Sequence, residues 1–238
     1  MCANVIAVPQ VIIQEIIDEI NRYNAANLLP DWPARWQPRP EDMKSSFPGA
    51  LLGVIAPDTE ARLSVQTMQW GYDVSWSKQL IFNTRFDTAT KPGRNMWADS
   101  LAERRCVVPT FGFYEPHKSQ TFINPRSGKP NKQNYFFTGP DSEIVFLAGV
   151  FQDMQFSLMT TEPNSIMSPI HGRMPVVLMP NELDSWLFGD YLSVEDRSSI
   201  DLISNKVERF QEDSGGVLEG SWKDPEKLEG SWERSTKS

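Results

Sequence analysis

The sequence predicts an α+β fold with a largely antiparallel, barrel-like sheet and flanking helices. Short β-like runs fill the middle of the chain, helical patterns occur only towards its two ends, and strands and helices do not alternate regularly. The 238 residues are 39% hydrophobic and 23% charged, which fits one well-packed domain and excludes a disordered or fibrous class.

The first predicted element is an amphipathic helix over residues 11–24, whose apolar stripe should pack on the sheet. Five isoleucines recur there at helical spacing, at Ile12, Ile13, Ile16, Ile17 and Ile20. The next stretch, residues 28–48, holds five prolines and is predicted to be a long irregular surface segment.

Nine apolar runs rich in β-branched and aromatic residues are then predicted as strands. They span residues 51–56, 63–70, 80–82, 106–108, 111–114, 135–138, 144–150, 156–161 and 176–178. Towards the end, Asn181 is predicted to cap a helix through Trp186. Ser193, followed by Glu195 and Asp196, is predicted to begin another helix.

The domain is expected to cover residues 1–212, followed by a flexible acidic tail over residues 213–238. Gly, Ser and charged residues dominate this tail. It repeats Leu-Glu-Gly-Ser-Trp at 218–222 and 228–232. A cloning remnant and a partner-binding peptide explain the repeat equally well.

The net charge of −8 argues against binding nucleic acid by bulk electrostatics, so a DNA site would have to be local. No apolar run reaches eighteen residues and the N-terminus lacks a basic signal region, so we expect a cytoplasmic protein without a membrane partner. Cys2 and Cys106 are then expected to be reduced thiols. We expect a monomer that uses no cofactor.

Cys2 is the residue best suited to covalent chemistry. Removal of Met1 would leave an amine and a thiol on adjacent carbons, and together these trap an aldehyde as a five-membered thiazolidine. An α-amine with a pKa near 8 is partly neutral at physiological pH and therefore nucleophilic. On position alone, a small residue that merely permits methionine removal is the simpler interpretation of Cys2.

Three further motifs accompany Met1-Cys2: Asn-Thr-Arg-Phe-Asp-Thr at 83–88, Gly-Phe-Tyr-Glu at 112–115 and His-Gly-Arg-Met-Pro at 171–175. In this order and spacing the chain resembles the SOS response-associated peptidase (SRAP) family from Met1 to about Val207. The resemblance implies an SRAP-like fold and covalent attachment to abasic sites in single-stranded DNA, which shields the lesion in the DNA damage response. It also implies a peptidase step on the protein's own N-terminus and allows a lyase activity.

The resemblance assigns catalytic roles to four residues: Cys2 aligns with the nucleophile, Asn83 with the asparagine beside it, Glu115 with the general acid/base and His171 with the motif histidine. A carboxyl group of raised pKa or an imidazole can move protons near neutral pH. Asn83 does not titrate and would orient the reacting groups. From the residues alone, a solvated turn carboxylate, a histidine that bonds a backbone carbonyl and a turn-forming asparagine remain alternatives.

Arg85 and Arg173 are the expected phosphate ligands, because guanidinium groups match phosphate oxygens. A structural pair with Asp87 is the alternative for Arg85. The family usually follows its cysteine with Gly-Arg, whereas this chain has Ala3-Asn4, so one expected cation is missing. Weaker or more salt-sensitive DNA binding should result.

The resemblance adds Trp76 and the Pro48-Gly49 loop to the expected DNA contacts. The indole would support a base or sugar of a single strand, and a glycine allows close approach of the DNA backbone. Trp70, in the Trp-Gly-Tyr segment, is expected to be a core residue.

Three other functions compete with this interpretation. Cys2, Cys106, His117 and His171 match the ligand count of a zinc site, but their spacing does not fit one, so we expect no metal. A cysteine peptidase using Cys2 or Cys106 with His171 is a second alternative, although Cys106 is predicted to be a buried strand residue. A non-catalytic DNA-binding module that keeps the fold is the third.

Overall fold

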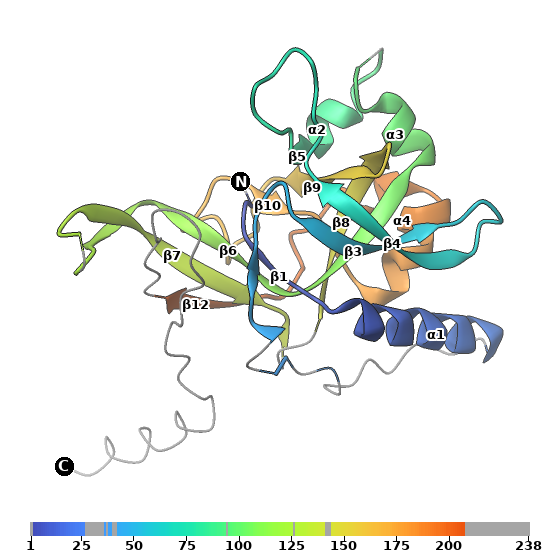
Figure 1. Cartoon of the computed structure of the whole chain (residues 1–238), viewed down its shortest axis with the longest axis horizontal. Helices are drawn as coiled ribbons and strands as arrows, with labels where there is room; N and C mark the ends of the chain where they lie inside the picture. Colours follow the sequence, from blue (N-terminus) through green and yellow to red (C-terminus); the bar gives the residue numbers. More distant parts are fainter. Residues whose placement is uncertain are drawn as a thin grey trace, which may run out of the picture.

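The computed structural model describes residues 2–26, 36, 38–39, 42–93, 95–125, 127–140 and 144–207 (Figure 1). The predicted tail over residues 213–238 lies outside the described residues, as does most of the predicted irregular segment 28–48. Among the described residues, no helix is both long and apolar enough to span a membrane.

Five strands pair in a closed ring, which confirms the predicted α+β class with a largely antiparallel sheet. The strands are β3 (Leu51–Pro57), β4 (Leu63–Trp70), β6 (Arg105–Ile123), β8 (Val145–Gln152) and β9 (Gln155–Thr161). Strand β6 pairs with β8, β8 with β9, β9 with β4, β4 with β3, and β3 with β6. Only the β4–β9 pairing in this ring is parallel.

Seven further strands extend the ring. They are β1 (Val5–Ala7), β2 (Ser45–Ser46), β5 (Asn83–Arg85), β7 (Pro130–Thr138), β10 (Met174–Pro175), β11 (Val177–Leu178) and β12 (Ile203–Val207). Strand β1 lies between β6 and β2, whereas β5 pairs in parallel with β9. These pairings bring both ends of the described chain and the middle of the sequence into one sheet.

Helices cover the outside of the ring. The α-helices are α1 (Gln10–Ala26), α2 (Phe86–Ala89), α3 (Ala98–Glu103) and α4 (Leu183–Phe188), and the 3-10 helices are η3 (Pro180–Glu182) and η4 (Tyr191–Val194). The isoleucine stripe of α1 packs on the sheet as predicted, since Ile13, Ile16 and Ile17 share a buried cluster with Ile55 of β3.

Alternate side chains of the ring strands enter two separate cores, as the strand period of two requires. Val54, Trp70 and Leu147 belong to a cluster with members on all five ring strands and none on α1, α3 or α4. Ile55 and Ala148 belong to a second cluster that includes side chains from those helices. The first cluster therefore fills the ring, and the second lies between the ring and its helices.

Two predicted elements and one predicted cap are wrong. Asn181 lies inside the 3-10 helix η3, and the N-cap of α4 is Glu182. Residues 80–82 form no strand, because Ile81 pairs only with Tyr72 in an isolated bridge and regular pairing starts at Asn83. Ser193 lies inside the 3-10 helix η4 (Tyr191–Val194) instead of starting an α-helix. The Asp196 carboxylate accepts the backbone N–H of Ser198 at 2.8 Å, a local bond that competes with helix formation.

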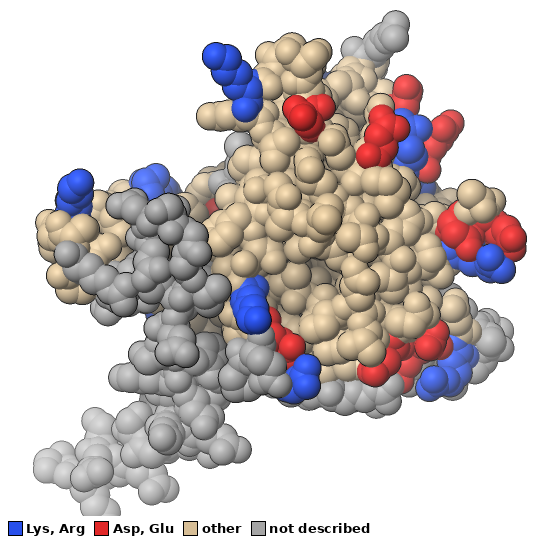
Figure 2. All heavy atoms as spheres, viewed as in Figure 1, with Lys and Arg blue, Asp and Glu red and all other residues tan. Residues whose placement is uncertain are grey.

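The two strands predicted at 106–108 and 111–114 are one strand, β6, which runs through Pro109. Proline has no backbone N–H that would need a partner. Its carbonyl oxygen accepts the backbone N–H of Val8 at 3.4 Å, so the residue is accommodated in the strand. The far part of β6, together with β7 and β12, projects from the body as an arm at the left of Figure 1. Blue, basic side chains lie on this arm in Figure 2.

Candidate active site

Cys2 lies at the end of the core inside the ring, and the register of β1 puts it there. Val5 pairs with Phe113, and the Tyr114 N–H donates to the carbonyl of Asn4 at 2.9 Å. Continuing this antiparallel register brings Cys2 next to the segment that contains Glu115. The Cys2 side chain is fully buried, and burial, followed by the nearby Glu115 carboxylate, raises the pKa of its thiol well above the usual range.

Asn83 is the first residue of β5 and contacts Cys2 directly. Its Nδ2 donates to the Cys2 carbonyl oxygen at 2.8 Å. Its Oδ1 is buried and has no hydrogen-bond partner among the described residues. The Asn83 side chain therefore holds the backbone of Cys2 and keeps its Oδ1 available as an acceptor. This role differs from that of a turn-forming asparagine.

Glu115 lies on β6 and has a fully buried side chain, so it is not a solvated turn carboxylate. Phe113, two residues earlier, points into the ring and stacks on Phe137 at 5.3 Å, and the strand period places Glu115 on that same face. Burial raises the pKa of Glu115 to about 7. At neutral pH this carboxyl group can therefore both give and take a proton.

His171 approaches Glu115 from the segment before β10. Its Nδ1 lies 3.8 Å from Glu115 Oε2 and 2.9 Å from the carbonyl oxygen of Arg173. The Arg173 N–H also lies 3.3 Å from Nδ1, but the contact with the carbonyl is shorter, so we assign the proton to Nδ1, which donates to that carbonyl and leaves Nε2 as an acceptor. Burial lowers the pKa of His171, so the imidazole is mainly neutral at pH 7.

Asp87 joins the two predicted phosphate-binding arginines. Arg85 Nη2 lies 2.7 Å from Asp87 Oδ2, and Arg173 Nη2 lies 3.2 Å from Asp87 Oδ1. Arg173 also pairs with Glu162 at 2.5 Å and donates to the carbonyl of Thr160 at 2.7 Å. The Arg85 side chain is 54% exposed, against 13% for Arg173, so Arg85 is much more accessible to a phosphate.

The Arg85–Asp87 pair agrees with the alternative expected from the sequence, whereas the acidic partners of Arg173 were not expected. Asp87 and Glu162 lie 86 and 11 positions from Arg173, and no local pattern connects them. In the sequence, Asp87 within the 83–88 motif is the one feature that could have indicated acidic partners for these arginines.

The remaining predicted DNA contacts lie on loops. Trp76 is 67% exposed in the loop between β4 and β5, whereas Trp70 is fully buried, as expected. Gly49 adopts a φ of 97°, a conformation that favours glycine, and its N–H donates to the Trp70 carbonyl at 2.7 Å. Pro48 is partly exposed beside it.

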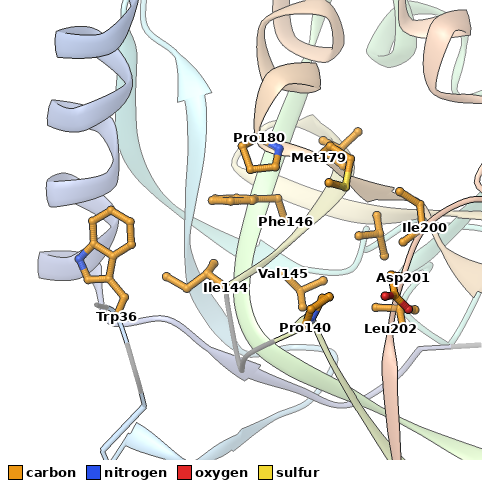
Figure 3. Close-up of a pocket in the computed structure, with 13 residues that line it drawn as sticks. Trp36, Pro140, Ile144, Val145, Phe146, Met179, Pro180, Ile200, Asp201 and Leu202 are labelled. Carbon is orange, nitrogen blue, oxygen red and sulfur yellow. The ribbon is translucent and has the colours of Figure 1, made fainter. Parts of the chain in front are cut away.

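Cys106 and the apolar pocket take no part in this arrangement. Cys106 is a buried strand residue without a disulfide, and burial raises the pKa of its thiol. An apolar cavity of about 120 Å³ lies between β8, β11 and residues 200–202 (Figure 3), and its lining includes none of the predicted site residues. In the part of the chain that is described, no three metal-ligating side chains cluster.

Comparison with known families identifies the family to which this chain belongs. The sequence profile of the SOS response associated peptidase (SRAP) family matches residues 9–211, which is most of the chain. The chain belongs to the SRAP family. The matched range starts after Cys2, so the SRAP match does not itself cover this residue.

Curated relatives of this SRAP chain carry one shared description. The abasic site processing protein YoaM of Bacillus subtilis is 28% identical over 58% of this chain, which spans 61% of the length of YoaM. Abasic site processing proteins YoqW of B. subtilis and HMCES of Rattus norvegicus are 24% and 27% identical, each over 74% of this chain, and the matches cover 77% and 62% of their own lengths.

Solved structures support the SRAP-like fold. A protein of Bordetella bronchiseptica aligns over 87% of this chain and 100% of its own, with a TM-score of 0.59 and 19% identity. A protein of Bacteroides thetaiotaomicron aligns over 87% of this chain and 92% of its own, with a TM-score of 0.58 and 19% identity. At this level of identity the likeness concerns the fold alone.

Proposed function

We propose that this protein processes abasic sites in single-stranded DNA by forming a covalent bond through Cys2 after removal of Met1. The observation that carries the proposal is the grouping of Cys2 with Asn83, Glu115 and His171 at one end of the ring. The names of the curated relatives, abasic site processing proteins, support the same substrate.

The chemistry requires the amine and the thiol of the same residue. The freed α-amine attacks the sugar aldehyde and, with loss of one water, gives an imine. The thiol then adds its sulfur to the imine carbon and its proton is transferred to the nitrogen, closing a thiazolidine. The net change is the joining of protein and DNA with loss of one water molecule.

Glu115 is the proposed proton carrier for these steps. An abasic sugar is mostly a closed hemiacetal, so its ring must be opened by proton transfer before the amine can react. A carboxyl group with a pKa near 7 is present in both forms at neutral pH, which suits consecutive donation and acceptance. The raised thiol pKa means that the Cys2 sulfur needs a base as it attacks, and Glu115, whose charge acts on the thiol, is the proposed base.

Release of Met1 would expose the reactive amine, and the same residues are proposed to perform it once per molecule. This restricts the peptidase activity to maturation, and a general cysteine peptidase is not proposed. A pairing of Cys106 with His171 gains no support, because Cys106 is buried in β6 within the core of the ring.

Intact mass spectrometry with an abasic oligonucleotide tests the proposal. We expect loss of Met1 and a gain equal to the oligonucleotide mass less one water. Comparing wild type with Cys2→Ser separates the roles of the thiol and the amine. Cys2→Ser keeps the amine but should give only an imine, which borohydride reduces, whereas the wild-type adduct should resist borohydride. Full denaturant-resistant attachment by Cys2→Ala would refute the role of the thiol, and turnover of added peptides would favour the general peptidase.

A further inference from the structure

The projecting arm carries a local excess of positive charge in an acidic protein. Between Pro116 and Pro140 the chain has four cations, Lys118, Arg126, Lys129 and Lys132, and no Asp or Glu, whereas the net charge of the whole chain is −8. The three lysines are exposed on the described part of the arm. Blue side chains are visible on this arm in Figure 2.

These lysines differ from the arginines of the body, whose charge is largely neutralised. Arg62, Arg85 and Arg173 each lie within 4 Å of a carboxylate. Among the described residues, neither Lys129 nor Lys132 has an acidic partner. Unneutralised ammonium groups on an exposed strand pair attract phosphate without competition from the protein's own carboxylates.

The arm is continuous with the candidate active site. A register shift between Pro116 and Thr121 bends β6 where it leaves the body. At this bend the backbone N–H of Lys118 donates to the Ile170 carbonyl at 2.8 Å, and its Nζ donates to the Ser168 carbonyl at 2.9 Å. The base of the arm is therefore attached to the segment that holds His171.

Lys132 lies further along β7, opposite Thr121. Burial is the main cause of the lowered pKa of His171, and the Lys132 charge is a smaller one. The Lys118 hydrogen bonds attach the base of the arm to the His171 segment, so the cationic surface begins at the base of the arm. From there it extends outward to Lys129, next to the turn at Gly128. A DNA strand that leaves the candidate active site towards Lys132 would pass along the arm.

We propose that this arm binds the phosphate backbone of the DNA strand a few nucleotides from the lesion, through Lys129 and Lys132. The inference rests on the proposed function for the identity of the strand. The arm also supplies the local basic surface that a DNA-binding protein with a net charge of −8 needs. Lysine contacts to phosphate strengthen binding without reading sequence.

The test compares K129Q/K132Q with R22Q/R62Q, a double variant with the same loss of charge on α1 and the β3–β4 turn. Binding of unmodified single strands is measured by fluorescence anisotropy from 20 mM to 300 mM salt. We expect K129Q/K132Q to raise Kd roughly three- to tenfold on a long strand at low salt and to flatten the slope of log K against log salt by about 1. R22Q/R62Q should bind like wild type.

Strand length locates the contact. Oligonucleotides with the abasic position near the 5′ end should differ in Kd from those with it near the 3′ end, because the longer flanking segment can reach the arm in only one of the two cases. K129Q/K132Q should abolish that difference in Kd. Equal affinities and salt slopes for the two double variants on every strand would overturn the inference. An adduct that forms normally in that case leaves the proposed function intact, whereas a lysine effect without any adduct refutes the proposed function alone.

Discussion

The side-chain amide of Asn83 donates a 2.8 Å hydrogen bond to the carbonyl oxygen of Cys2. The bond joins the first residue of β5 to the N-terminal segment, 81 positions away. Strand β5 is itself held by parallel pairing with β9, where Asn83 is opposite Leu158. The position of the proposed nucleophile therefore depends on a strand of the sheet and not on the N-terminal segment alone.

Asn83→Ala should slow attachment to DNA about fivefold with little change in DNA affinity. Loss of one hydrogen bond of this kind costs about 1 kcal/mol, and the backbone of Cys2 would lose its support. Asn83→Asp should be slower still, because a carboxylate repels the carbonyl oxygen. Single-turnover crosslinking at saturating DNA measures this, with Asn205→Ala on the exposed strand β12 as the control. An effect on affinity alone would contradict the positioning role.

Much of the fold was predictable because its signals are local. The isoleucine stripe of α1 and the continuous apolar runs of β3, β8 and β9 are long enough to show their period. In contrast, α2 has four residues and α3 six, too few to show a helical pattern. Strand β12 is built from Ile-Ser-Asn-Lys-Val, whose polar centre favours no strand, and it forms by pairing along β7.

The site was predictable in its residue types but not in its electrostatics. Motif resemblance pointed to Cys2 and Glu115, whereas the burial that raises the pKa of Glu115 depends on how β6 enters the core of the ring. The acidic partners of Arg173 likewise come from tertiary contacts. No sequence period encodes either property.

Arg85 and Arg173 should respond differently to the same substitution. Arg85→Gln should weaken single-strand binding and leave the free energy of unfolding nearly unchanged, because an exposed ion pair contributes little. Arg173→Gln should also destabilise the protein, by about 1–3 kcal/mol, since its mostly buried guanidinium pairs with Asp87 and Glu162 and donates to the Thr160 carbonyl. Urea unfolding and anisotropy together separate the two effects. Equal stability losses would show that both arginines are structural.

Trp76→Ala should weaken binding of single-stranded DNA by about 1–3 kcal/mol, the range found for stacking of one base on an aromatic side chain. The indole is 67% exposed, so the melting temperature should stay within about 1–2 °C of wild type. Phe188→Ala removes another exposed ring, 44% accessible, on α4 and provides the control. If both variants bind DNA like wild type, Trp76 does not stack on a base.

Glu115→Gln should remove a pH dependence of stability that wild type possesses. The pKa of Glu115 is raised from 4.5 to about 7 in the folded protein, so between these values the folded state holds a proton that the unfolded state has lost. The stabilising contribution is thus complete below about pH 4.5 and disappears as the pH rises through about 7. Its size is about 3 kcal/mol, because each unit of pKa difference corresponds to about 1.4 kcal/mol.

Urea unfolding between pH 5 and pH 8 measures this contribution directly. The free energy of unfolding of wild type should fall with rising pH relative to that of Glu115→Gln, and the difference should level off above about pH 7.5. Glu60→Gln, which alters an exposed carboxylate in the β3–β4 turn, should follow the wild-type curve. Parallel curves for wild type and Glu115→Gln would mean that Glu115 is ionised at neutral pH in the folded protein, and it would then be unable to act as the proton donor that opens the abasic sugar.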